Sequence, residues 1–409
     1  QDHYYYDDMQ TEDHVASLIN TSYMPLCKTI AEMIRLSKGR FHCALSVSGT
    51  MLEMFEQYAP EMIDVLKELA ATGCVEFIVT PYAYSLASVY SDTEAIEQLQ
   101  SQQAVVKQLL GVESTTAGLT ELLYSDEIAI QLHKMGFKAV MTEGAKHILS
   151  WKSPNYVYSS SAAPKLKVLL RNTTLSDELA FHFSDPAWHN FPMDAEKFAT
   201  ALATLPEEEQ VANIWVGAET FGVRQSATSG IFDFLKALPY YAMEQEMGFM
   251  TPSEVAKKFA ASDAVVVPYP LTWAGEGKDL STYNGNDLQQ EAVQKLYAVA
   301  ERVHLCKDKQ LKHDWLILQD VNYLHFMNHI DQGATQFESA YDAFINYMNI
   351  LSDFLQRVEE QYPTTIENEE LNELLKTIQN QEKEIAKLEK QLKEAKKTTK
   401  KTCAKKAEM

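Results

Sequence analysis

The chain has 409 residues, of which 46% are apolar, so it can bury a substantial core, and global disorder is excluded. Its formal net charge of −21 argues against nucleic acid as the main partner but leaves a neutral polysaccharide open. No apolar run is long enough to span a membrane and no signal peptide is recognisable, so we expect no membrane partner.

The five cysteines are scattered along the chain and include no Cys-x-x-Cys pair. This pattern indicates reduced, mostly buried thiols in a cytoplasm, in place of a disulfide framework or a zinc site. The histidines also lack the spacing of zinc ligands. The sequence therefore predicts a cytoplasmic protein with no metal site.

Residues 1–270 alternate between predicted helices and short apolar strands. Predicted helices span 11–38, 60–72, 93–110, 126–135 and 194–205. Predicted strands span 41–47, 75–80, 115–119, 138–141, 166–170, 212–216 and 264–267. Largely apolar strands that alternate with helices indicate an α/β fold with a parallel sheet covered on both faces, here an irregular (β/α) barrel.

Beyond residue 270 the pattern changes to long amphipathic helices, which predict a helical bundle over residues 271–363. These helices are expected at 288–306, 309–327 and 339–358.

Residues 364–395 then carry a heptad repeat, whose first core position is occupied by Leu371, Ile378, Ile385 and Leu392. We predict a coiled coil that joins chains into a homo-oligomer through residues 371–395, with a lone helix folded back on the bundle as the alternative. The Lys-rich tail, 396–409, is predicted to be disordered.

One carboxylate stands at a position typical of active sites in α/β barrels. Glu121 follows the predicted strand 115–119, in the turn before a helix that Ser125 can cap. In α/β barrels such turns face the active site. The same position also suits an ordinary acidic partner of a helix dipole, so the local pattern leaves both interpretations open.

The stretch Thr120–Ile128 resembles the nucleophile motif of glycoside hydrolase family 57, especially its α-amylase-like branch. A second stretch, Ala-Glu-Thr-Phe-Gly at 218–222, is similar to that family's acid/base motif, aspartate-aromatic-Glu-Thr-Phe-Gly. The resemblance covers about residues 3–363 and implies a seven-stranded (β/α) barrel that acts on α-glucans without a cofactor. The family's first strand, ending in His-Gln-Pro, is absent before His3, so we expect a fragment or an incomplete barrel.

The resemblance also implies which residues carry chemistry. Glu121 falls on the family's nucleophile, whereas the acid/base aspartate falls on Gly217, which has no titratable group. Glu219 stands where the family has a supporting residue and not the proton donor. Because a retaining mechanism needs two carboxyl groups about 5–5.5 Å apart, we expect impaired catalysis.

Further family positions are predicted to bind substrate, namely Glu76, Tyr82, Tyr84, Glu219, Trp273 and Asp279. Trp273 suits stacking on a glucosyl ring, with a core tryptophan as the equal alternative. Glu76 either holds a sugar hydroxyl or is a buried, hydrogen-bonded carboxylate. Tyr84 and Arg224 replace family histidines, which together with Gly217 indicates relaxed catalytic demand.

Three functions therefore compete. The chain is an active α-glucan hydrolase or transferase, an impaired homologue that binds α-glucan or organises partners through its coiled coil, or an acidic scaffold with an empty cleft. The missing acid favours the second function, because losing general acid catalysis costs about 10²–10⁴-fold in rate.

Overall fold

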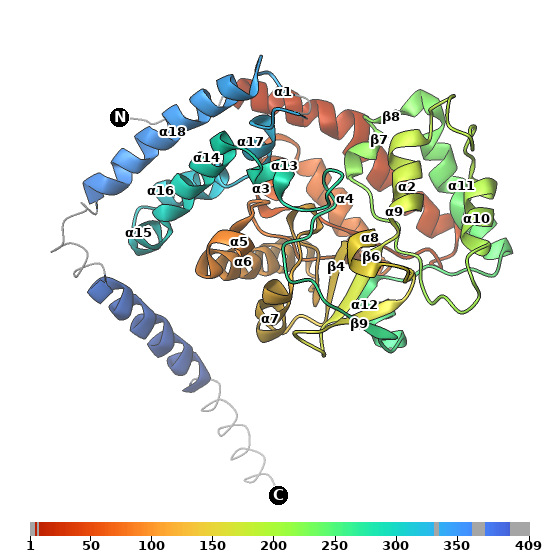
Figure 1. The fold of residues 1–409 in the computed structure, drawn as a ribbon, viewed down its shortest axis with the longest axis horizontal. Helices are drawn as coiled ribbons and strands as arrows, with labels where there is room; N and C mark the ends of the chain where they lie inside the picture. Colours follow the sequence, from red (N-terminus) through yellow and green to blue (C-terminus); the bar gives the residue numbers. More distant parts are fainter. Residues whose placement is uncertain (1–4, 6–7, 331–334, 362–372, 393–409) are drawn as a thin grey trace, which may run out of the picture. The chain divides into compact units, whose positions relative to one another are not determined.

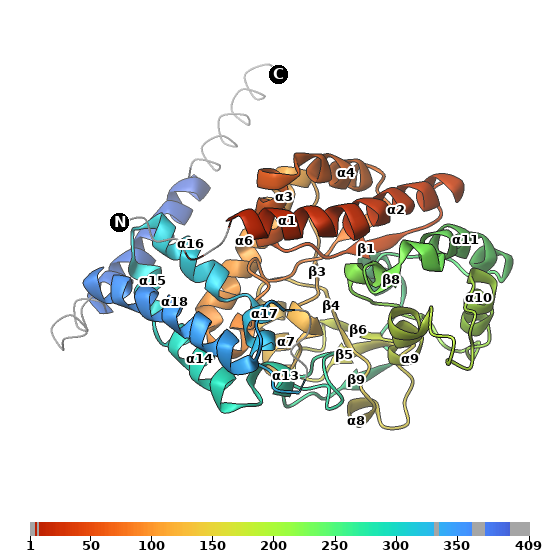
Figure 2. The same ribbon diagram turned by 90° about the horizontal axis from the view of Figure 1, so that it is seen from above.

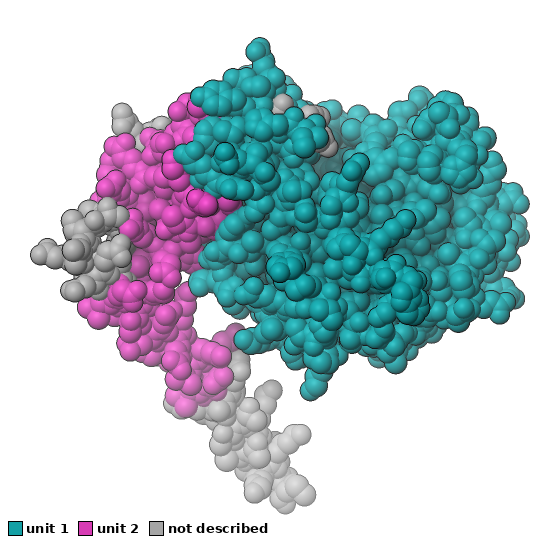
Figure 3. Space-filling model, viewed as in Figure 1, with its two compact units in different colours: residues 1–291, 319–344 teal, residues 292–318, 345–409 magenta. Residues whose placement is uncertain are grey.

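The computed structural model describes residues 5, 8–330, 335–361 and 373–392 (Figure 1). The chain divides into two compact units, coloured in Figure 3: unit 1 holds residues 1–291 and 319–344, and unit 2 holds 292–318 and 345–409. Within the described ranges, no helix is both long and apolar enough to cross a membrane. The four-part division predicted from the sequence stays a prediction, and the Lys-rich tail lies outside the described residues.

The main sheet of unit 1 has five strands in the order β3-β4-β6-β5-β9. Their bounds are Thr116–Ala117, Ala139–Glu143, Lys167–Arg171, Val157–Ser160 and Asp263–Val265. Strand β4 runs parallel to β3 and β6, and β5 runs parallel to β9. Strand β5, which the sequence did not predict, runs antiparallel to β6 because the connection between them is too short for a crossover. The sheet is therefore mixed, and the prediction of a purely parallel sheet is wrong at this strand.

The remaining strands form two separate pairs, and single bridges join further segments to the main sheet and to its neighbours. Strands β1 (Cys43–Leu45) and β2 (Val75–Phe77) pair in parallel. Single parallel bridges join Val79 to Ala117 and Arg171 to Asn213. The predicted strand 212–216 is represented by that second bridge alone, and β7 (Phe221–Gly222) pairs with β8 (Gln225–Ser226). The α/β class is thus observed, while the incomplete (β/α) barrel stays a prediction.

The first helices of unit 1 follow one another along one rod, which Figure 2 shows from above. Helix α1 (Asp8–Leu18) passes through a π-helical turn, η1 (Ile19–Tyr23), into α2 (Met24–Leu36). Pro25 follows the π-helical turn inside this continuous rod, so its missing N–H interrupts the intrahelical hydrogen bonds at the point where their spacing changes.

Helices α2, α4, α10 and α11 pack together beside the sheet (Figure 1). Their shared core includes Met33, Leu66, Leu69 and Ile231, each no more than 2% exposed. Beyond α1 and α2, the helices of this unit include α3 (Gly49–Tyr58), α4 (Pro60–Ala71), α5 (Ala87–Tyr90), α6 (Asp92–Leu110), α7 (Asp126–Lys134), α8 (Lys146–Leu149), α9 (Thr173–Asp177), η3 (Glu178–His182), α10 (Ala195–Ala203), α11 (Ile231–Glu244), α12 (Pro252–Lys258), α13 (Ser281–Asn284) and α17 (Val321–Phe326).

Unit 2 is helical, as the amphipathic pattern predicted, but the predicted helices 288–306 and 309–327 are each divided into two shorter ones, whereas 339–358 is observed at full length. It is built from α14 (Asp287–Ala298), which begins in unit 1, then α15 (Ala300–Leu305), α16 (Lys309–Leu318) and most of α18 (Ala340–Gln361). The indole of Trp315 donates a hydrogen bond to the carbonyl of Leu296 at 3.0 Å, and Tyr347 donates to the carbonyl of Leu318 at 2.8 Å. These buried polar groups fix the register of the helices because their partners lie on neighbouring elements.

A further helix spans residues 373–392. Near its start, Lys376 forms an ion pair with Glu301 at 2.6 Å. Its heptad core residues are exposed to solvent, with exposed fractions of 58, 42, 55, 57 and 55% for Leu374, Ile378, Ile385, Leu388 and Leu392. The helix is thus present, while the pairing that a coiled coil requires stays a prediction.

Candidate active site

The turn that carries Glu121 has an unusual backbone. The short helix η2 (Thr120–Leu122) connects β3 to α7, and Glu121 and Leu122 have φ angles of 56° and 57°. A positive φ costs a residue other than glycine about 1–3 kcal/mol and persists only where surrounding contacts enforce it. Here the backbone carbonyl of Glu121 accepts from the backbone N–H of Trp273 at 3.0 Å, and the carbonyl of Leu122 accepts from the Thr142 hydroxyl at 2.7 Å. The fold thus holds Glu121 in a strained turn at the end of a strand.

Three donors from distant segments meet on the Glu121 carboxylate. The Tyr84 hydroxyl donates to Oε1 at 2.9 Å, and the Trp273 indole N–H donates to Oε2 at 2.6 Å. The Tyr283 hydroxyl, on α13, also donates to Oε2. Burial, followed by the charge of Glu121, raises the pKa of Tyr84 well above its ordinary value, so its hydroxyl stays a donor. The carboxylate is therefore held in one orientation.

Gly217 faces the same site. Its φ and ψ of −65° and 145° are extended values that any residue adopts. A Cβ at this position would lie 3.3 Å from Oε2 of Glu219 and 4.0 Å from the ring of Trp273. Because Trp273 also binds Glu121, the two residues predicted at the acid/base and nucleophile positions, Gly217 and Glu121, flank the same indole.

A buried ionic cluster that the sequence analysis missed supports that indole. Arg171, at the end of β6 and 3% exposed, forms ion pairs with Glu143 at 2.9 Å and Asp177 at 2.5 Å. Its guanidinium also donates to the carbonyl of Trp215 at 2.7 Å and lies 5.4 Å from the ring centre of Trp273. The available signal was a charged residue closing each of two apolar strands, β4 and β6. Arg171 thus links the strand ends to the segment before Gly217.

The structure brings Tyr84, Glu121, Gly217, Glu219 and Trp273 together, but it gives three other predicted residues different partners. The carboxylate of Glu76 accepts hydrogen bonds from Ser114 and Ser253. The Tyr82 hydroxyl donates to Glu53 at 2.5 Å, and Asp279 accepts from the Ser281 N–H at 2.9 Å. These bonds suit structural roles, and substrate binding by Glu76, Tyr82 and Asp279 stays a prediction.

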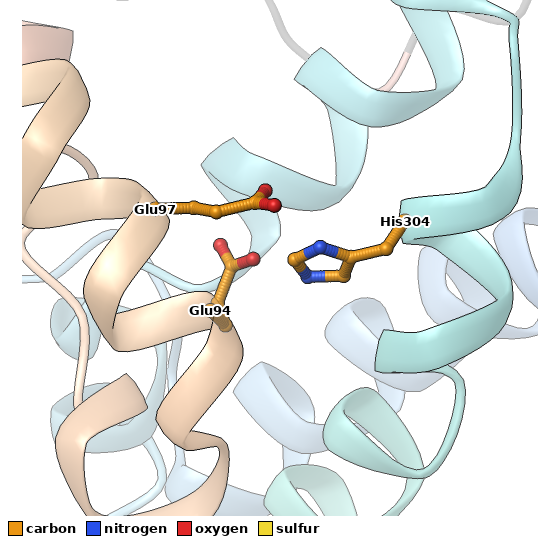
Figure 4. Close-up of side chains that lie close together, drawn as sticks. All are labelled: Glu94, Glu97 and His304. Carbon is orange, nitrogen blue, oxygen red and sulfur yellow. The ribbon is translucent and has the colours of Figure 1, made fainter. Parts of the chain in front are cut away.

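Two acidic residues of α6, Glu94 and Glu97, project from neighbouring turns of that helix (Figure 4). Oε1 of the buried Glu94 accepts from the side-chain amides of Gln98 at 2.7 Å and Gln319 at 2.9 Å, both in unit 1. His304, also labelled in Figure 4, belongs to α15 of unit 2, where its ring packs edge-on against Trp315. The side-chain amides of Gln98 and Gln319 therefore offset the cost of burying the Glu94 carboxylate.

Asp320, another residue that the sequence analysis missed, carries a perturbed carboxyl near the site. It pairs with Ser85 through an antiparallel bridge and caps α17, accepting from the Asn322 N–H at 2.8 Å. Burial raises the pKa of Asp320 to about 6, with a smaller contribution from the charge of Glu121, and the bonds from Asn322 oppose the rise. The carboxyl is thus protonated in mildly acidic solution.

Asp320→Asn should consequently change how stability depends on pH. The pKa is raised in the folded state, so between its ordinary value and about 6 the folded chain binds a proton that the unfolded chain lacks. The free energy of unfolding therefore falls as pH rises through that window. The variant has no such proton. The difference between its melting temperature and that of the native chain should therefore shift in favour of the variant as pH rises from about 4 to about 7. Asp194→Asn, at the exposed start of α10, is the control, and an equal gain for both variants would contradict the assignment.

Residues 1–268 match the family described as glycosyl hydrolase family 57, and the chain belongs to that family. A relative from Methanocaldococcus jannaschii, named "Putative alpha-amylase", is 30% identical over 375 residues, which cover 87% of this chain and 79% of the relative.

Among solved structures, a 4-alpha-glucanotransferase from Thermococcus litoralis has a TM-score of 0.67 at 14% identity, covering 88% of this chain but only 58% of that one. A GH57 branching enzyme from Thermococcus kodakaraensis also has a TM-score of 0.67 at 14% identity, covering 89% of this chain and 90% of that one. Similarity at this level of identity shows a shared fold.

Proposed function

We propose that the chain is an α-amylase-like member of its family that binds α-glucan and cleaves it poorly. The observation that carries this proposal is the asymmetry of the site. The nucleophile position holds a carboxylate oriented by three donors, whereas the acid/base position holds Gly217. Protonation of the leaving oxygen is the missing step, because a retaining mechanism needs one carboxyl group to attack and another to donate.

Binding of the sugar does not need that proton. Trp273 is half-buried and offers an aromatic surface beside Glu121, and the hydroxyls of Tyr84 and Tyr283 lie at the same carboxylate. An indole suits the apolar face of a pyranose ring, and hydroxyls suit its polar edge. Affinity for α-glucan oligosaccharides should therefore persist where catalysis is weak.

Calorimetry with maltoheptaose tests this binding. We expect measurable heat at millimolar sugar and a roughly tenfold weaker affinity for Trp273→Ala, since the variant loses the stacking surface. Trp151→Ala is the matched control because Trp151 is 87% exposed on a turn and contacts none of these residues through a described hydrogen bond. Absence of heat for the native chain would favour a scaffold with an empty cleft.

A second proposed role, assembly, depends on the helix 373–392. Its apolar seam is exposed, and a second copy of the chain would cover it. In a parallel pair in register, Glu384 of one chain would face Glu389 of the other, so we expect repulsion that salt weakens.

Sedimentation of the whole chain therefore should show oligomers that grow stronger with added salt. Leu388→Glu should dissociate them, while Lys390→Glu, on the side of the helix away from the seam, should not. A chain truncated after residue 363 lacks the seam altogether, so it should sediment as a monomer. Monomeric mass for the native chain at micromolar concentration in high salt would end this proposal.

A further inference from the structure

The carboxylate of Glu219 lies beside the position that lacks an acid. One of its oxygens, Oε1, accepts a hydrogen bond from the Tyr23 hydroxyl at 2.5 Å. The other, Oε2, lies 3.3 Å from the point where a Cβ on Gly217 would stand, and within the described residues it accepts no hydrogen bond. The space left by a missing side chain at 217 is thus bordered by a carboxyl oxygen.

The surrounding backbone fixes this carboxylate. The segment η4 (Ala218–Thr220) rests against the π-helical turn η1, where the Ser22 hydroxyl donates to the carbonyl of Ala218 at 3.0 Å. Gly222 makes the contact possible, since a Cβ there would lie 1.8 Å from the carbonyl oxygen of Thr21. The turn η1, far from Glu219 in the sequence, therefore contacts the backbone on both sides of Glu219 and binds one of its carboxylate oxygens.

Glu219 also lies within electrostatic reach of the nucleophile position. Its charge contributes to the raised pKa of Tyr84, whose hydroxyl binds Glu121. The ring of Trp273 borders the same point beside Gly217 and donates its N–H to Glu121. Trp273 thus connects Glu121 to the point beside Gly217 that Glu219 borders.

We propose that Glu219 is the proton donor for the α-glucan turnover that the chain retains, an inference that rests on the proposed function. Glu121 attacks the anomeric carbon while the bond from that carbon to the glycosidic oxygen breaks. The electron pair goes to the oxygen, which takes the proton from Oε2 of Glu219. Water then attacks the glycosyl ester of Glu121, and the Glu219 carboxylate takes the proton from that water, restoring both groups.

Substrates with different leaving groups test this proposal. Maltoheptaose needs protonation of its leaving oxygen, whereas fluoride in α-maltosyl fluoride leaves with little help. Glu219→Gln should therefore lower kcat/KM for maltoheptaose by about 10²-fold while changing that for the fluoride by less than about threefold. Glu113→Gln, which removes an exposed carboxylate at the other end of β3, should change neither value.

A further variant separates proton donation from a structural role. In a Gly217→Asp background the introduced acid replaces the donor, so Glu219→Gln should then cost less than about tenfold.

Each outcome decides the proposal. Equal losses on both substrates would show that Glu219 only supports the fold of the site. Fluoride turnover that depends on Glu121, without any turnover of maltoheptaose, would overturn donation by Glu219 and leave the proposed function intact. If neither substrate were turned over, both the proton donation by Glu219 and the proposed residual cleavage would be overturned.

Discussion

Glu121→Gln should abolish turnover of α-maltosyl fluoride, lowering kcat/KM by roughly 10³-fold or more. With this substrate the departing fluoride needs little protonation, so the rate depends on the attacking group. The amide is not a nucleophile for the anomeric carbon. It also places an N–H₂ group toward either Tyr84 or the Trp273 and Tyr283 pair, all of which are donors to the carboxylate in the native chain.

The Glu121→Gln variant must first be shown to fold with the strained turn intact. Glutamine has the shape of glutamate, so the variant should keep a cooperative unfolding transition and should still bind maltoheptaose. Glu113→Gln again serves as the matched loss of one carboxylate, and it should turn over the fluoride at the native rate. Unchanged fluoride turnover in Glu121→Gln would show that the reacting carboxylate lies elsewhere.

Gly217→Asp should raise kcat/KM for maltooligosaccharides by about 10²-fold, because it supplies a carboxyl at the predicted acid/base position. The extended backbone at this position accepts a side chain without strain. The new Cβ would lie 3.3 Å from Oε2 of Glu219, the oxygen that Tyr23 does not bind, so this oxygen has to move by only a few tenths of an ångström. A carboxylate placed next to another one has a raised pKa, which suits a general acid near neutral pH.

Two variants at the same position isolate the proton from the side chain. Gly217→Ala adds the Cβ without an acid, and Gly217→Asn adds a similar shape that does not act as a general acid, so neither should raise the rate. The gain in Gly217→Asp should also be small on α-maltosyl fluoride, which does not need the donor. An equal gain for Asn and Asp would mean that packing beside Trp273, and not proton donation, limits the native chain.

The candidate site shows what local sequence can and cannot predict. Glu121 could be predicted as a site residue because a strand, a turn and a capped helix follow one another within a few residues. The hydrogen bonds that join it to Tyr84, Trp273 and Tyr283 link segments far apart in the chain, and no periodicity reports such contacts. For Glu76 the sequence left two interpretations open, and its bonds to Ser114 and Ser253 favour the structural one.

The fold shows the same division. Apolar runs bounded by glycine and proline located α4, α6 and α7 to within a residue or two of their ends. Strand β5 was missed because four residues carry little periodic signal, and its direction is set by the short return to β6. The ion pairs of Arg171 were missed because each partner comes from a different element. Contacts of this kind are set by tertiary packing.

A site that can attack a sugar but lacks an efficient proton donor should discriminate sharply between leaving groups. That discrimination is the ratio of kcat/KM for α-maltosyl fluoride to that for maltoheptaose, measured on the native chain and on Gly217→Asp under the same conditions. We expect a large ratio in the native chain and a fall of about 10²-fold in the variant, because the variant gains only on the substrate that needs protonation. Vigorous hydrolysis of maltoheptaose by the native chain, unaffected by Glu121→Gln, would contradict this assignment of the site.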